Sequence, residues 1–182
     1  MVDIANLEKG ERGKIEFPPS LTQALGSYLN QEIAPQLARI GEGIRNLPKN
    51  SKGVEAMENG RKRIEEFLNS FEEAEKVTLA MENGLADKFE FSGQRKEKTL
   101  KPGVITADQT LTRTLVNGLD HVIRNPLNPL IGRSEDNYPE IYGASSRILQ
   151  VMELFNHAQE LKITIDSSGR STLTIIPNSP AG

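Results

Sequence analysis

The sequence contains no cysteine, so disulfides, thiolate metal sites and a cysteine nucleophile are excluded. It has no basic excess either, because 22 lysines and arginines face 25 aspartates and glutamates, for a net charge of -3. A nucleic-acid partner is therefore not expected. No apolar run approaches the roughly 18 residues that span a bilayer. Residues 1–14 also lack the charged and then apolar order of a signal peptide. We expect a cytoplasmic protein without a membrane partner.

The chain has one cluster of basic residues, GQRKEKTLKPG at residues 93–103. Glu97 interrupts this cluster and glycines flank it, which favours a solvated linker over a binding site. The sequence also lacks a glycine-rich phosphate-binding stretch; GEG at 41–43 and DSSGRS at 166–171 are better explained by a loop and a hairpin turn.

Two early segments place apolar residues every three or four positions, the pattern of helices with one side facing a core. The first follows PPSLTQAL, where Ser20 is the predicted N-cap and Gln23 its capping-box partner. The second runs from about Val54 to Glu75. The short loop between them favours an antiparallel pair. The alternating segments KVTLAM and DKFEFSG that follow predict a β-hairpin.

The same plan then repeats. Helices are predicted for Leu111 to about Ile131 and for Tyr142 to Leu161, followed by a β-hairpin that turns at residues 167–169. The first helices of the two halves align at an offset of 90 positions (119 − 29), and the second helices at 84 (151 − 67). We interpret the repeat as an internal duplication.

Neither helical hairpin can bury its apolar stripe alone, whereas two hairpins together enclose one core. We therefore predict a mainly α fold, a four-helix bundle built from two tandem helical hairpins that are each followed by a short β-hairpin, so that the chain is a pseudo-dimer. The predicted parts are an N-terminal arm (1–19) with GKIEF as a candidate short strand, a first half (20–92), a linker (93–107) and a second half (108–182). The linker is long enough for the two hairpins to pair within one chain or to be exchanged between two chains, so the sequence is also compatible with a homodimer.

The charged side of the second predicted helix is interpreted as a solvated face with i,i+4 ion pairs. Its residues are Arg61, Lys62, Arg63, Glu65 and Glu66.

His121 falls on the polar side of the third predicted helix. At about 100° per residue, the imidazole lies opposite the apolar stripe that contains Leu119. Its polar neighbours are Asn117, Arg124, Asn125 and Asn128. Prolines 126 and 129 follow. Because a proline inside a helix removes a backbone hydrogen bond and displaces a carbonyl group, we expect a bend and local unwinding just after His121.

The segment HVIRNPLNPLIG, residues 121–132, resembles the phosphoacceptor motif of sensor histidine kinases. In that family the histidine precedes an acidic residue, an aliphatic residue, Arg, Asn or Thr, Pro and Leu. The matching residues are His121, Ile123, Arg124, Asn125, Pro126, Leu127, Leu130 and Gly132. The resemblance covers about Leu111 to Leu161 and implies a dimerisation and phosphoacceptor domain, with His121 as the phosphoacceptor. Pro126, Leu127 and Pro129 then belong to the structural part of the motif.

Three departures from the family pattern limit this resemblance. Val122 occupies the position of the acidic residue that assists autophosphorylation. In the first half, Gln31 occupies the histidine position and Glu32 the acidic one. Only 21 residues follow Leu161 in the 182-residue sequence, fewer than the family's ATP-binding domain requires. We therefore expect that the chain does not use ATP by itself.

Together these observations predict a histidine phosphotransfer protein of a two-component phosphorelay, which exchanges a phosphoryl group between His121 and a response-regulator receiver domain. Arg124 is expected to neutralise phosphoryl oxygens, and Asn125 and Asn128 to donate hydrogen bonds to them. The receiver would supply Mg²⁺, and the chain would hold no cofactor or metal of its own. A histidine kinase stays open as a second partner.

The sequence is also compatible with two other functions. It does not decide whether the chain is an enzyme. One is a non-catalytic, degenerate kinase-like module that binds and regulates a receiver or a kinase domain. The other is a helical scaffold whose β-hairpins offer contact edges. His157 has no comparable sequence context and is interpreted as a surface residue.

Overall fold

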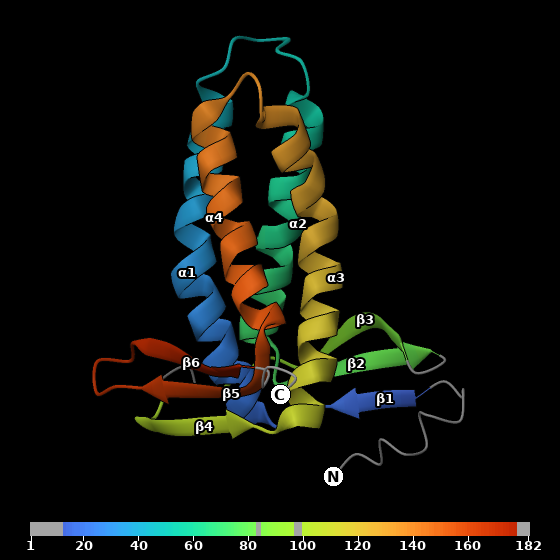
Figure 1. Ribbon diagram of the computed structural model, residues 1–182, viewed down its shortest axis with the longest axis vertical. Helices are drawn as coiled ribbons and strands as arrows, with labels where there is room; N and C mark the ends of the chain where they lie inside the picture. The colour runs from blue at the N-terminus through green and yellow to red at the C-terminus, as the bar shows by residue number, and fades with distance from the viewer. Residues whose placement is uncertain (1–12, 83–84, 97–99, 178–182) are drawn as a thin grey trace, which may run out of the picture.

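The structure, a computed structural model, describes residues 13–82, 85–96 and 100–177. Four long helices stand side by side, and two small sheets lie at their lower end (Figure 1). The helices are α1 (Pro19–Arg45), α2 (Val54–Glu73), α3 (Gln109–Ser134) and α4 (Pro139–Asn156). In the described part of the chain, no helix is both long and apolar enough to cross a membrane.

Each sheet has three antiparallel strands. The first sheet has the order β1 (Gly13–Glu16), β2 (Lys76–Glu82) and β3 (Leu85–Ser92). The second sheet has the order β4 (Gly103–Ala107), β5 (Ala158–Ile165) and β6 (Ser171–Pro177). The element order is therefore β-α-α-β-β twice, which we call the first and the second repeat. The repetition of the plan that the sequence predicted is present in the structure.

The predicted fold class, a mainly α four-helix bundle, is wrong. Strands make up 23% of the structure beside 58% helix, so helices and sheets are mixed and the molecule is not a helical bundle. The difference comes from β1 and β4, which precede their helices and pair with β2 and β5. Strand β4 lies in the segment predicted as a linker, and β1 lies in the predicted arm, at the candidate strand GKIEF. Each of them forms hydrogen bonds with the free edge of a predicted hairpin. In addition, Ile15 of β1 and Ala107 of β4 are buried.

Predicted helix ends are also corrected. Residues 41–43, which were expected to form a loop, are part of α1. Helix α1 begins at Pro19 after Pro18, and no side chain caps it, so Ser20 is not the N-cap. The fixed φ of proline suits the first helical position, where its missing N–H would have no partner anyway. Helix α4 ends at Asn156 instead of Leu161, because Leu161 is paired with Ala107 in the second sheet.

Helix α3 is continuous from Gln109 to Ser134, so the predicted unwinding after His121 is wrong. Its start is fixed by Asp108, whose carboxylate accepts a hydrogen bond of 2.8 Å from the backbone N–H of Leu111. Pro126 is buried in the core and Pro129 is half-buried. Packing of the apolar side around Pro126 holds the helix together despite the hydrogen bonds that both prolines remove.

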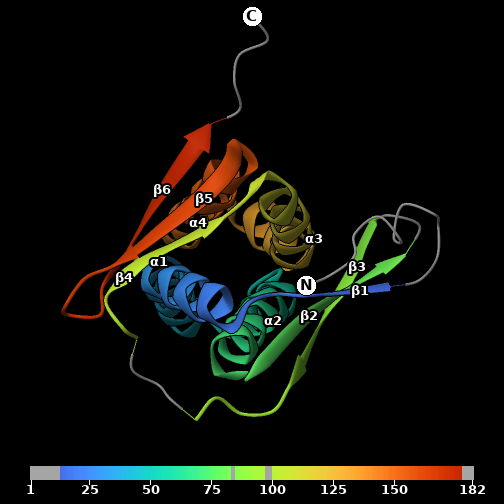
Figure 2. The same cartoon turned by 90° about the horizontal axis from the view of Figure 1, so that it is seen from below.

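Each helix contacts two neighbours, in the cyclic order α1, α2, α3, α4 (Figure 2). The apolar stripes that the sequence predicted point into the space between them. The residues that align between the first helices of the repeats are all buried: Leu29, Ile33, Leu37 and Ile40 in α1, and Leu119, Ile123, Leu127 and Leu130 in α3. One core therefore joins the two repeats.

The sheets connect the repeats a second time. The first sheet contacts α3, which belongs to the second repeat, and all three strands of the second sheet contact α1 of the first. At Gly118 of α3, an added Cβ would lie 3.0 Å from the ring of Phe89 and 3.1 Å from Leu79. A glycine at this position lets the first sheet lie directly against α3.

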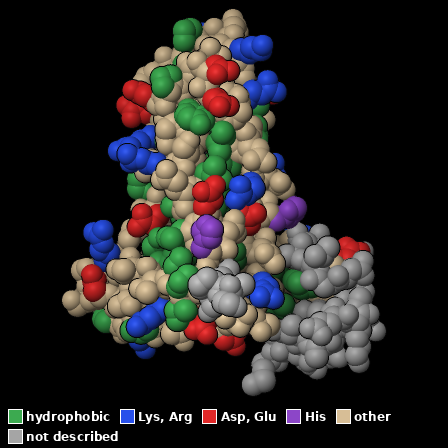
Figure 3. Space-filling view, viewed as in Figure 1, with side chains coloured by type: hydrophobic (Ala, Val, Ile, Leu, Met, Phe, Trp, Pro, Cys, Tyr) green, Lys and Arg blue, Asp and Glu red, His purple; other side chains and the backbone are tan. Residues whose placement is uncertain are grey.

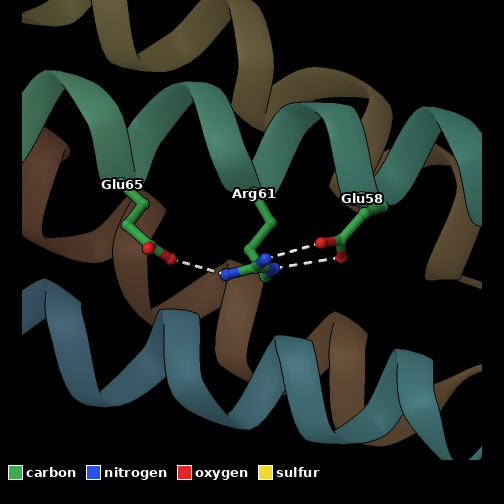
Figure 4. Close-up of polar contacts among 3 residues, drawn as sticks. All are labelled: Glu58, Arg61 and Glu65. Atoms are coloured by element: carbon green, nitrogen blue, oxygen red, sulfur yellow. Dashed lines mark hydrogen bonds and ion pairs between the residues drawn. The ribbon is translucent and has the colours of Figure 1, made fainter.

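Helix α2 carries an ion-pair network on the side that points toward α1 (Figure 4). The guanidinium of Arg61 lies 2.6 Å from Glu65 and is bonded to both carboxylate oxygens of Glu58, at 2.5 and 3.0 Å. The i,i+4 pair with Glu65 was predicted, whereas the contribution of Glu58 was not. The stem of Arg61 lies against Gly41 of α1, so the network also covers the α1–α2 contact.

The network predicts a pH dependence of stability. The hydrogen bonds from Arg61 lower the pKa of Glu58 below its ordinary value of 4.5. This contribution is therefore complete above pH 4.5 and is lost as the pH falls toward the lower folded pKa. Because both side chains are partly exposed, it amounts to less than about 1 kcal/mol. Urea unfolding at pH 7 and pH 3 should show a smaller acid-induced loss in Glu58→Gln than in the wild type. Glu66→Gln, which removes a carboxylate without an ion pair to a described residue, is the charge-matched control.

The contact between α2 and α3 predicts a steric effect at Gly60. A Cβ added there would stand 2.5 Å from the backbone oxygen of Pro126, which cannot move without shifting α3. Gly60→Ala should therefore lower the free energy of unfolding by about 1–3 kcal/mol despite its better helix propensity. Gly143→Ala, in α4 with nothing within 4 Å, should raise it by about 0.5–1 kcal/mol. Equal effects of the two substitutions in denaturant titrations would contradict the close packing at Gly60.

Candidate functional site

His121 lies in the middle of α3, on the side that faces away from the core, and its side chain is exposed. No hydrogen bond or ion pair joins the imidazole to another described residue. Figure 3 shows histidine side chains, in purple, at the surface of the molecule. The ring nitrogens of His121 are therefore not engaged by the described part of the protein.

Arg124 was predicted to neutralise a phosphoryl group, but its guanidinium already has an internal partner. It lies one turn after Asp120, and its Nε and Nη2 atoms are 3.0 and 2.9 Å from Asp120 Oδ1. Asn156 at the end of α4 donates a hydrogen bond of 3.3 Å to the same oxygen. The pair is about one-third exposed. Asp120 thus cancels part of the positive charge that Arg124 brings to the site, and the i,i+4 spacing of the two residues was the sequence signal for this pair.

The remaining predicted residues divide into an exposed and a packed group. Asn125 and Asn128 are exposed, on the same side of α3 as His121. Pro126 and Leu127 are buried, and Pro129 is half-buried. The structure therefore places polar groups in a stripe around the imidazole and buries Pro126 and Leu127 in the core.

The equivalent position in the first repeat has a different environment. Gln31 lies on α1, and its side chain makes two hydrogen bonds with the backbone of Ser171 at the start of β6. Gln31 Nε2 donates to the carbonyl oxygen at 2.9 Å, and the backbone N–H of Ser171 donates to Gln31 Oε1 at 3.1 Å. The hydroxyl of Ser171 also bonds to that of Ser27, at 3.1 Å. The second sheet thus covers the Gln31 position, which is half-buried, while His121 stays exposed.

No protein-family model, curated protein or solved structure matches the chain. The resemblance to sensor histidine kinases therefore rests on the motif at residues 121–132 alone. Within the described residues, no group of three or more His, Cys, Asp or Glu side chains is arranged to hold a metal ion.

The two equivalent positions predict different effects on stability. Gln31→Ala leaves the backbone N–H and carbonyl of Ser171 without their side-chain partners, and it should cost about 1–3 kcal/mol of unfolding free energy. His121→Ala removes an exposed side chain without internal bonds and should change it by less than about 0.5 kcal/mol. Chemical denaturation of both variants measures the difference. A loss in His121→Ala as large as that in Gln31→Ala would show that the imidazole has a structural role.

Proposed function

We propose that the chain is a histidine phosphotransfer protein of a phosphorelay, with His121 accepting a phosphoryl group from a response-regulator receiver domain and returning it. The observation that supports this proposal is the exposed imidazole at the centre of a continuous helix, with no bond to another described residue. The motif around it resembles a phosphoacceptor motif, and its packed residues hold the helix in the core. A continuous helix fixes the position of the His121 backbone, which lowers the entropic cost of reaching a reactive geometry.

The chemistry requires little from this chain. The lone pair of an unprotonated ring nitrogen attacks the phosphorus of an aspartyl phosphate on the receiver. The N–P bond forms, the acyl P–O bond breaks, and the aspartate oxygen keeps the electron pair as a carboxylate. Mg²⁺ in the receiver neutralises the transferring group. Asn125 and Asn128 are exposed on the same side of α3 and can donate hydrogen bonds to the phosphoryl oxygens.

One observation favours a second function, a non-catalytic module that binds and regulates a receiver or a kinase domain. Arg124, the cation closest in sequence to the phosphoacceptor position, is paired with Asp120. Val122 also replaces the family's acidic residue and is half-buried. A site in which the arginine is paired and the acidic position holds a valine can still bind a partner without transfer.

The proposal predicts transfer of label to one histidine. Receiver domains encoded in the same genome are phosphorylated on aspartate and mixed with the wild type, His121→Ala and His157→Ala. We expect acid-labile label on the wild type and on His157→Ala, since His157 is the matched exposed histidine. We expect none on His121→Ala. Label that survives His121→Ala, or no label from any receiver, would refute the phosphotransfer function.

The binding of His121→Gln separates the two candidate functions. Under the phosphotransfer proposal, this variant binds the receiver but accepts no phosphoryl group, whereas the wild type does both. If the wild type binds a receiver with no transfer and His121→Gln binds it equally well, the regulatory function is correct. Isothermal titration together with the labelling assay measures both properties.

A further inference from the structure

The two repeats carry a surface recess in the same place, between the first half of the first helix and the end of the second helix. In the second repeat the recess has a volume of about 260 Å³, and its polar lining includes Arg113, Asn117, Asn156 and Gln159. In the first repeat it has a volume of about 520 Å³, and its lining includes Gln23, Ser27 and Glu72. At the offsets of the repeat, Gln23 corresponds to Arg113 (113 − 23 = 90), Ser27 to Asn117 (117 − 27 = 90) and Glu72 to Asn156 (156 − 72 = 84).

The recess of the second repeat is built from hydrogen-bond donors. Arg113 is exposed, and its guanidinium makes no ion pair or hydrogen bond with another described residue. Asn117, Asn156 and Gln159 add amide groups, and no carboxylate is among the described residues that line the recess. Asp120 bonds to Asn156, which lines the recess, and is itself paired with Arg124. This composition suits an oxyanion.

The recess of the first repeat has the opposite character. Glu72 and Glu73 line it, and burial together with the charge of Glu73 raises the pKa of Glu72. The turn at residues 167–169 of the second sheet also borders it, next to the hydrogen bonds between Ser171 and Gln31. Although Arg95 contributes a cation, its Nε and Nη2 atoms donate to the carbonyl oxygen of Ala74 at the end of α2. The guanidinium keeps its charge, and its buried Nη1 atom has no hydrogen-bond partner among the described residues. The two carboxylates nevertheless outnumber this one cation, so the first recess suits an anionic side chain less well than the second.

The donor-lined recess adjoins His121. Asn117 and Arg113 precede it by one and two turns of α3, about 6 and 12 Å along the helix axis. A protein that covers His121 buries roughly 800 Å² of each partner in a standard interface, enough to extend over both turns. We propose that this recess receives an aspartate or glutamate side chain of the receiver domain that docks over His121, and that the chain consequently docks one receiver, on its second repeat. This inference rests on the proposed function.

The test compares receiver binding by Arg113→Gln and Arg39→Gln. Arg113→Gln installs the residue type found at the equivalent position, Gln23, and Arg39→Gln makes the same change of charge at an exposed position of α1. Isothermal titration uses the genome's receiver domains at several salt concentrations. We expect the affinity of Arg113→Gln to fall about tenfold or more, with a weaker dependence on salt. We expect Arg39→Gln to match the wild type, and the stoichiometry to be one receiver per chain.

The outcomes separate the inference from the function on which it rests. Transfer of label to His121 together with full receiver affinity in Arg113→Gln would overturn the inference and leave the proposed function intact. An equal loss in Arg39→Gln would overturn it as well, because the effect would then be one of net charge. A stoichiometry of two receivers per chain would overturn the assignment to one repeat. If no receiver binds or labels the chain, the proposed function fails and the inference fails with it.

Discussion

The burial of four apolar helix faces against one another is the constraint on which the rest of the structure depends. Each helix contacts two neighbours, and no helical hairpin could cover its own stripe. The central residues of the stripes, such as Ile33, Ile64, Ile123 and Ile148, have no exposed surface. This burial requires both repeats at once, so the outer surfaces of the two repeats are held at fixed positions in one molecule. Where the two repeats differ in sequence, two sides of the molecule therefore differ.

The two sheets increase the difference between the outer surfaces of the two repeats. Each sheet packs against the first helix of the opposite repeat, so it modifies a surface that its own repeat does not carry. On α1, the second sheet reaches Gln31 and binds it through the backbone of Ser171. On α3, the first sheet packs at Gly118 and leaves His121 exposed three residues later. A repeated plan thus produces one covered and one open copy of the same helical surface.

The open copy is the surface on which the proposed function places its partner. Its polar residues surround an imidazole that makes no bond with the described residues, and the donor-lined recess extends the polar surface toward the start of α3. Asp120 pairs with Arg124 on the same helix and offsets its charge. Binding there would depend on a few directed hydrogen bonds and on Arg113, because Asp120 offsets the charge of Arg124.

The sequence by itself determined the helices, the β-hairpins, the repeated plan and the side of α3 on which His121 lies. These features follow from the spacing of apolar residues along the sequence. A spacing of three to four residues matches the turn of a helix and a spacing of two matches a strand, so one buried side is enough to identify each element. Only the tertiary structure decided that β1 and β4 complete two sheets, that Pro126 leaves α3 unbroken, and that Gln31 is covered while His121 is open. Each of these outcomes depends on contacts between residues far apart in the chain. The hydrogen bonds between Gln31 and Ser171, for example, span 140 positions, and no local pattern encodes them.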